Sequence, residues 1–213
     1  MESFKDISDR YGCDKSIGHN YHNIYPQFLE FLRNRFFNLL EIGIGAGSSY
    51  RLWADYFPYA KIYGLDISIS HIGPRGEIFK GDQSNREDLK KLISEIGRCK
   101  VVIDDGSHLA DHQIGTFEYL FEFMLDYGGI YIIEDIETSY WRADAKIYGY
   151  ETGHLNIIDY FTRYNHDVNS HIHGRQNKLG IMSVTYYENC IIITKRQEAE
   201  KMEKPYYFKM QLP

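Results

Sequence analysis

The stretch at residues 38–47 constrains this chain most, because it reads NLLEIGIGAG: an apolar run, one acid and three glycines at alternate positions. A short apolar run bounded by turn residues is typical of a buried strand. Glycines allow positive φ and close approach of a ligand to the backbone, and Ser48 and Ser49 are expected to cap a following helix whose N-terminus faces that ligand. A tight strand-to-helix turn without a ligand is the competing interpretation. The three glycines are Gly43, Gly45 and Gly47.

A second strand is expected at residues 61–66, ending on Asp66. Its position, about twenty residues after the turn, is where the hydroxyls of a ribose need an acceptor. Glu41 before the first glycine, combined with Asp66, is the pattern of S-adenosylmethionine (SAM) methyltransferases more than of NAD enzymes. An NAD-dependent oxidoreductase remains an alternative, disfavoured because the Gly-x-Gly-x-x-Gly spacing is missing.

The remaining cofactor-binding residues follow from placing SAM over this turn. We expect its adenine near Asp82 and Gln83, and its amino-acid end near Glu41 with Lys15 or Tyr21. Asp104, which ends a later strand, and Ser48 complete the predicted cofactor set.

Strand and helix patterns alternate along the chain, which predicts a mostly parallel sheet covered on both faces, with ligands at the carboxyl ends of the strands. Two β-rich runs at the end, 179–187 and 189–194, predict an antiparallel hairpin. This order is the Rossmann-like, seven-stranded α/β arrangement of class I SAM methyltransferases. The other strands are expected at about 36–42, 77–82, 100–104 and 130–134.

We expect a single methyltransferase domain over residues 1–213. Residues 1–23 are polar, with little core of their own, and are interpreted as a lid over a ligand rather than a frayed end. Residues 136–178 are the least regular part and are interpreted as a substrate-binding insertion.

Composition excludes several classes of partner. A formal net charge of -6, with dispersed Lys and Arg, gives no footprint for a nucleic acid backbone. No segment has the length of apolar sequence that a membrane span needs. The three cysteines show neither paired nor metal-ligand spacing, so we expect a reduced, cytoplasmic protein, with Cys99 and Cys190 as small core residues.

A second group of residues carries chemistry. One strand ends in Asp104 and Asp105, with His108 three residues later, and the next strand ends in Glu134 and Asp135. Adjacent parallel strands would bring these acids together at the edge where the glycine turn lies. Such carboxylates need a cation, and oxygen ligands suit Mg²⁺, Mn²⁺ or Ca²⁺. His108 is placed to take a proton from a hydroxyl held on the metal.

Plainer interpretations stay open for these residues. The Asp-Asp-Gly-Ser run could be a helix-capping turn, Glu134 and Asp135 solvated loop acids, and His108 a surface histidine. His171 and His173 have no third ligand nearby and are interpreted as loop residues. Solvated helix positions are expected for His112, His154 and His166.

The residues from Lys15 to His22, the Glu-Ile-Gly-Ile-Gly turn, the Asp-Asp-Gly-Ser-His run and Glu134-Asp135 together resemble the metal-dependent sugar O-methyltransferases of the macrocin and mycinamicin type. They are more loosely similar to the cephalosporin-hydroxylase-like and rhamnosyl O-methyltransferase group. The resemblance spans roughly residues 9–141. It implies Asp105, Glu134 and Asp135 as Mg²⁺ ligands and His108 as the base.

The resemblance implies SAM-dependent, divalent-metal-dependent methylation of a hydroxyl on a sugar or glycosylated small molecule. The macrolide enzymes carry a further N-terminal domain and form oligomers, so the acceptor and a homo-oligomer are left open here, with another glycan as the alternative acceptor. From a different class, a catalytically inactive SAM-fold protein acting as a binding or regulatory subunit is the second hypothesis.

Overall fold

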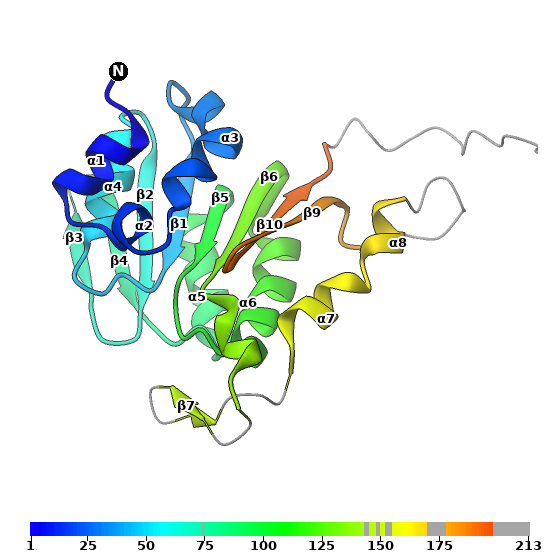
Figure 1. Cartoon of the computed structure of the whole chain (residues 1–213). Coiled ribbons are helices and arrows are strands. Elements are labelled where there is room, and N and C mark those ends of the chain that lie inside the picture. The colour runs from blue at the N-terminus through cyan, green and yellow to red at the C-terminus, as the bar shows by residue number, and fades with distance from the viewer. Residues whose placement is uncertain (74, 143–144, 148–149, 152–154, 170–177, 198–213) are drawn as a thin grey trace, which may run out of the picture.

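The computed structural model describes residues 1–73, 75–142, 145–147, 150–151, 155–169 and 178–197. A central sheet is built from β1 (Asn38–Ile42), β2 (Lys61–Asp66), β3 (His71–Gly73), β4 (Gly76–Lys80), β5 (Cys99–Asp104), β6 (Leu125–Glu134), β9 (Ile181–Tyr187) and β10 (Cys190–Lys195). Their order is β3-β4-β2-β1-β5-β6-β10-β9, and β7 (Lys146–Ile147) pairs separately with β8 (Tyr150–Glu151). Helices lie on both faces of the sheet (Figure 1).

The core of the sheet is parallel, as the sequence predicts. β1 pairs in parallel with β2 and β5, and the parallel pairs β2–β4 and β5–β6 extend the sheet on either side. β10 is antiparallel to both β6 and β9, which confirms the C-terminal hairpin. The carboxyl ends of β1, β2, β4, β5 and β6 therefore meet at one edge.

Two details differ from the sequence prediction. The sheet has an eighth strand, because three-residue β3 adds an antiparallel edge to β4 beyond the seven predicted strands. β4 itself ends at Lys80, so Gly81 and Asp82 belong to the loop beyond it. Glycine is disfavoured in strands, and an aspartate side chain can hydrogen-bond to the backbone two residues later in a turn. These two residues therefore favour a loop over a strand.

The helices are α1 (Phe4–Arg10), α2 (Asp14–Ile17), α3 (Tyr25–Leu29), α4 (Ser48–Tyr56), α5 (Arg86–Ile96), α6 (Ala110–Phe123), α7 (Ile157–Thr162) and α8 (Asn165–Val168). Three 3₁₀ helices accompany them in the described part of the chain: η1 (Tyr21–Asn23), η2 (Glu30–Leu32) and η3 (Ile136–Tyr140). Among the described residues, no helix combines the length and the apolar character that crossing a membrane requires.

Two hydrophobic cores lie on the two faces of the sheet, because successive strand residues point to opposite sides. Leu39 of β1 packs into a core that contains Trp53 of α4. Its neighbour Leu40 packs into the other core, with Phe117 of α6. The apolar runs in the strands thus supply both cores at once, as expected for a sheet covered on both sides.

Residues 1–23 contribute more core than their polar composition predicts. Phe4 is 3% exposed, and its ring lies 5.7 Å from that of Trp53 and 5.8 Å from that of Tyr25. Ser3 and Asp6 form a reciprocal capping box that begins α1. The expectation that this segment has little core of its own was wrong, because its few apolar residues are spaced to pack against α4 and the residues beside it.

The cysteines all lie in the interior of the protein. Cys13, Cys99 and Cys190 are all buried and free. Cys99 and Cys190 are core residues, as predicted, and Cys13 joins them.

Candidate functional site

The predicted glycine turn follows β1 and has the backbone that its glycines permit. Gly43, Gly45 and Gly47 have φ of 81°, 50° and 76°. A Cβ on Gly43 would lie 2.0 Å from the carbonyl oxygen of Asp105, so only glycine lets the ends of β1 and β5 approach this closely. The turn therefore places the predicted cofactor-binding residues after β1 next to the acids at the end of β5.

Asp66 at the end of β2 fixes this turn. Its Oδ2 accepts hydrogen bonds from the amides of Ile44 at 3.0 Å and Gly45 at 3.3 Å. Its Oδ1 accepts from the amides of Ser68 at 2.8 Å and Ile69 at 3.1 Å. Burial works against the charged form, but these amides outweigh it and lower the pKa of Asp66. If ribose hydroxyls donate to Asp66, the carboxylate would accept their hydrogen bonds in addition to those from these backbone amides.

The two serines after the turn do not cap α4. Gly47 is the N-cap, with no side-chain cap, and Ser48 is the first helical residue. Ser49 instead donates to Glu41 Oε2 at 2.8 Å, and Trp53 Nε1 donates to the other oxygen at 2.8 Å. Glu41 is fully buried, and burial raises its pKa to about 7. Glu41 therefore links β1 to α4 on the buried side of the turn.

Gln83 links the loop after β4 to the end of β5. Its amide nitrogen donates to both oxygens of Asp104, at 3.0 and 3.2 Å, and its oxygen accepts from the amide of Ser107 at 2.7 Å. Burial raises the pKa of Asp104 to about 6. Asp104 holds the loop, while Gln83 and Asp82 face the pocket.

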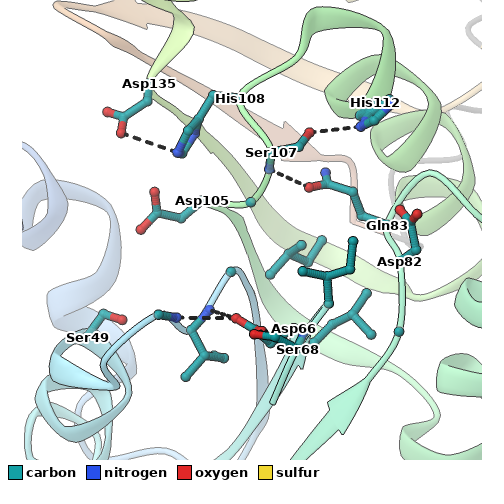
Figure 2. A pocket seen from close by; sticks show the side chains of 18 of the residues that line it. Ser49, Asp66, Ser68, Asp82, Gln83, Asp105, Ser107, His108, His112 and Asp135 are labelled. Atoms are coloured by element: carbon teal, nitrogen blue, oxygen red, sulfur yellow. Dashed lines mark hydrogen bonds and ion pairs between the residues drawn. The ribbon is translucent and has the colours of Figure 1, made fainter. Parts of the chain in front are cut away.

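A candidate cation site lies at the ends of β5 and β6. One ligand atom from each of Asp105, His108 and Asp135 can be chosen so that all lie within 4.8 Å of one another. His108 Nε2 lies 3.9 Å from Asp135 Oδ2, and Figure 2 shows the two side chains pointing toward each other. Burial, and then the charge of Asp105, raise the pKa of Asp135. The predicted convergence of two strand ends is therefore present in the fold.

Glu134 is bound to Lys15, whose ammonium also contacts Asp105 of this group. It is 2% exposed, both its oxygens lie 2.8 Å from Lys15 Nζ, and the Tyr25 hydroxyl donates to one of them. It is not the solvated loop acid of the alternative interpretation. Its side chain would have to leave Lys15 to join the acids predicted beside it.

Lys15 is the buried cation of the site. Its ammonium donates to Asp105 Oδ2 at 2.8 Å as well as to Glu134, and lies 3.7 Å from Glu41. Burial lowers the pKa of Lys15, but these carboxylates outweigh it and hold that pKa well above its usual value. Asp135 has no such ammonium partner in the described chain, so one lysine leaves excess negative charge at the site.

Tyr21 also lies beside the acids, not in the pocket. It is fully buried, and its hydroxyl donates to Asp135 Oδ1 at 3.1 Å and to the carbonyl of Asn189 at 3.0 Å. Tyr21 and Lys15 therefore connect the N-terminal segment to the ends of β5 and β6. The only residue of segment 1–23 that lines the pocket is Asp14, and the lid role of the segment stays a prediction.

The pocket at this edge has a volume of about 500 Å³, within the range of small-molecule sites. It brings together nine of the predicted site residues, namely Gly43, Gly45, Ser48, Asp66, Asp82, Gln83, Asp105, His108 and Asp135. The other predicted residues support it from behind or beside it: Lys15, Tyr21, Glu41, Gly47, Asp104 and Glu134.

Sequence reasoning missed His112, which was expected to be a solvated helix position. It lines the pocket, and its Nδ1 lies 3.0 Å from the Ser107 hydroxyl (Figure 2). Its position in the first turn of α6, directly after the end of β5 at the ligand-binding edge of the sheet, was the available signal. His154, His171 and His173 lie outside the described residues, and His166 is exposed on α8.

Comparison with solved structures identifies the fold. The MycE methyltransferase of mycinamycin biosynthesis, solved in complex with Mg, SAH and mycinamycin VI, superimposes with a TM-score of 0.80 and 28% identity over 93% of this chain and 55% of that one. The chain has the class I methyltransferase fold. No protein-family model matches it.

Curated relatives agree with this resemblance. The 8-demethyl-8-alpha-L-rhamnosyl tetracenomycin-C 2'-O-methyltransferase of Streptomyces olivaceus is 38% identical over 152 residues, covering 67% of this chain and 40% of the relative. The mycinamicin VI 2''-O-methyltransferase of Micromonospora griseorubida is 37% identical over 146 residues, covering 64% and 36%. The chain thus resembles sugar O-methyltransferases in sequence and in structure, and spans less than half the length of these two relatives.

Proposed function

We propose that the chain is a SAM-dependent, divalent-metal-dependent O-methyltransferase that acts on a hydroxyl of a sugar or of a glycosylated small molecule. One observation carries the proposal: the glycine turn and the group of Asp105, His108 and Asp135 line the same pocket. A nucleotide-binding turn alone would fit many proteins, but the pairing with a cation site and a histidine fits methylation of a hydroxyl. The sequence similarity to sugar O-methyltransferases supports the same conclusion.

The pocket offers SAM an open glycine backbone and polar side chains that can hydrogen-bond to it. The positive-φ glycines open the backbone beside Asp66, and Asp82 and Gln83 face the same cavity from the next loop. SAM supplies a methyl group on a positively charged sulfur and leaves as a neutral thioether when the carbon–sulfur bond breaks. Glu41, fully buried behind the turn, keeps negative charge on that side of the pocket at pH values above about 7.

The acids suit a hard divalent cation. Asp105 and Asp135 offer oxygen ligands at the ends of adjacent strands, and their charge exceeds what Lys15 neutralises. Glu134 completes the proposed set, as the resemblance implies, if its carboxylate turns from Lys15. A cation held there would lower the pKa of a bound hydroxyl.

The proposed base is His108. It lines the pocket beside Asp135, with its Nε2 3.9 Å from Oδ2, so the carboxylate would stabilise the imidazolium that forms when the ring takes the hydroxyl proton. The acceptor oxygen forms its new bond to the methyl carbon as that proton leaves. Orientation by the pocket supplies much of the rate, because SAM is already reactive.

Calorimetric titration with SAM, S-adenosylhomocysteine and NADH, each with and without Mg²⁺, tests the cofactor. We expect both sulfur nucleotides to bind and NADH not to bind. Binding of NADH alone would favour an oxidoreductase. SAM binding without transfer of a radiolabelled methyl group to any glycoside would favour an inactive binding or regulatory subunit.

A chelator tests the metal, and undiminished methyl transfer in EDTA would falsify its role. His108→Asn tests the base, because asparagine tolerates the positive φ of 57° at this position and keeps the turn folded. We expect it to bind SAM normally and to lose methyl transfer by at least about a hundredfold. His112→Asn is the matched control in the same pocket and should keep most of the transfer.

A further inference from the structure

The two carboxylate oxygens of Asp135 lie in different surroundings. Oδ2 lies 3.9 Å from Nε2 of His108, which lines the pocket (Figure 2). Oδ1 accepts hydrogen bonds from the hydroxyl of Tyr21 at 3.1 Å and from Nδ2 of Asn189 at 2.9 Å, and Nδ1 of His19 lies 3.5 Å from it. A carboxylate oxygen has two lone pairs. Two donors therefore occupy Oδ1, and Oδ2 is the oxygen presented to the pocket.

The side chain of Asn189 can only donate to Asp135. Its own Oδ1 accepts from the backbone amide of Glu137 at 2.9 Å, so the NH₂ end of the side chain points to the carboxylate. Asn189 lies in the turn between β9 and β10 with φ of 57°, a conformation that asparagine tolerates better than most residues. The hairpin therefore brings a donor of fixed direction to the end of β6.

The hydroxyl of Tyr21 is held in place by the ring that carries it. This ring is stacked between His19 and Tyr25, with ring centroids 5.2 and 5.3 Å away and interplanar angles of 17° and 19°. The side chain is 0% exposed, and its hydroxyl also lies 3.0 Å from the carbonyl oxygen of Asn189. Because the carboxylate and the carbonyl are both acceptors, the hydroxyl acts as a donor between them.

The backbone at Asp135 is strained, with φ of 53°. A non-glycine residue keeps such a conformation only where its surroundings determine it. Here the two donors come from Tyr21, 114 positions earlier, and from Asn189, 54 positions later. The N-terminal segment and the C-terminal hairpin thus converge on the end of β6 and fix the direction of one carboxylate.

A plainer interpretation is that Tyr21 fills the core and Asn189 fits a tight turn. Tyr56 represents that case for a tyrosine, because it is also fully buried and its hydroxyl donates to a carboxylate, that of Glu30, which does not line the pocket. Tyr56 therefore provides a reference for what a buried tyrosine–carboxylate hydrogen bond contributes to stability alone.

We propose that Tyr21 and Asn189 are positioning residues for the proposed methyl transfer, because they hold Oδ1 of Asp135 and thereby present Oδ2 to the cation and to His108. This rests on the proposed function, and it assigns Tyr21 to the cation site in place of the predicted cofactor contact. Residues that hydrogen-bond to a metal ligand orient it and set its affinity, and their loss weakens metal binding by about ten- to a hundredfold.

The test is titration of the full chain with Mn²⁺, in which electron paramagnetic resonance measures the free ion. Tyr21→Phe keeps the stacked ring and removes the hydroxyl. Asn189→Gly keeps the positive φ and removes the side-chain amide. We expect each variant to weaken Mn²⁺ binding by at least about tenfold, to keep one Mn²⁺ site per chain, and to bind S-adenosylhomocysteine in EDTA as the wild type does.

Tyr56→Phe is the matched control and should bind Mn²⁺ with the affinity of the wild type. Urea unfolding in EDTA should show similar losses of stability for Tyr21→Phe and Tyr56→Phe, so a difference in Mn²⁺ affinity between them reports on Asp135 rather than on a lost buried hydrogen bond. Equal Mn²⁺ affinity in Tyr21→Phe, Asn189→Gly and the control would overturn the positioning role and leave the proposed function standing. Failure of the wild type to bind Mn²⁺ would instead refute the metal-dependent function, and the positioning role with it.

Discussion

Replacing Lys15 by methionine gives the sharpest test of how the site is held together. Lys15 is 0% exposed and its ammonium lies 2.8 Å from Asp105 and from both oxygens of Glu134. Methionine fills similar space but leaves Glu134 buried without its cation. Breaking a buried ion pair by removing one partner costs about 3–5 kcal/mol. We expect Lys15→Met to lower the free energy of unfolding by that amount.

A double-mutant cycle isolates the pair. Glu134→Gln removes one charge but leaves Lys15 with Asp105, so its cost should be smaller, about 1–2 kcal/mol. The double variant Lys15→Met with Glu134→Gln should lose about 2 kcal/mol less than the two single losses predict, because no uncompensated Glu134 charge is left. Additive losses would contradict the assigned coupling.

Urea unfolding in EDTA, followed by the fluorescence of buried Trp53, measures these values without a cation that could replace the ammonium. Lys5→Met is the control, because its pair with Asp9 is exposed to solvent and should contribute little to stability. A Lys15→Met loss as small as that of the control would refute the reasoning. Added Mg²⁺ should then stabilise Lys15→Met more than the wild type, since the cation neutralises the same acids.

Two further predictions concern the fold around the site. Gly43→Ala should cost more than about 3 kcal/mol and abolish nucleotide binding, because its Cβ would meet the Asp105 carbonyl at 2.0 Å, whereas Gly45→Ala meets nothing within 4 Å and should cost only the positive-φ penalty of about 1–2 kcal/mol. Urea unfolding and calorimetry compare them, and equal losses would contradict the close approach. Burial raises the pKa of the Cys13 thiol from 9.0 to about 11, so the unfolded chain loses this proton at lower pH than the folded protein does. The free energy of unfolding should therefore fall by roughly 2 kcal/mol as pH rises from about 9 to 11, and Cys13→Ala should lack this part of the fall.

Much of the architecture follows from local sequence. Apolar runs such as 61–66 fix the strands, and the glycines after β1 fix the turn, because period and backbone freedom are properties of neighbouring residues. Once the sheet is known to be parallel, Asp105 and Asp135 must converge, since strand ends of the same direction share an edge. The pattern also predicted the C-terminal hairpin of β9 and β10.

Other features depend on where side chains point after packing. Lys15 and Glu134 are 119 positions apart, and no sequence pattern predicts that they pair. Asp66 was predicted beside a ribose, but its oxygens first hold the turn itself. The sequence by itself determined which acids reach the sheet edge. Only the tertiary structure decided which of these acids face a ligand and which face a buried lysine. The reason is that the contacts are made between segments far apart in the chain, and no sequence pattern relates those segments.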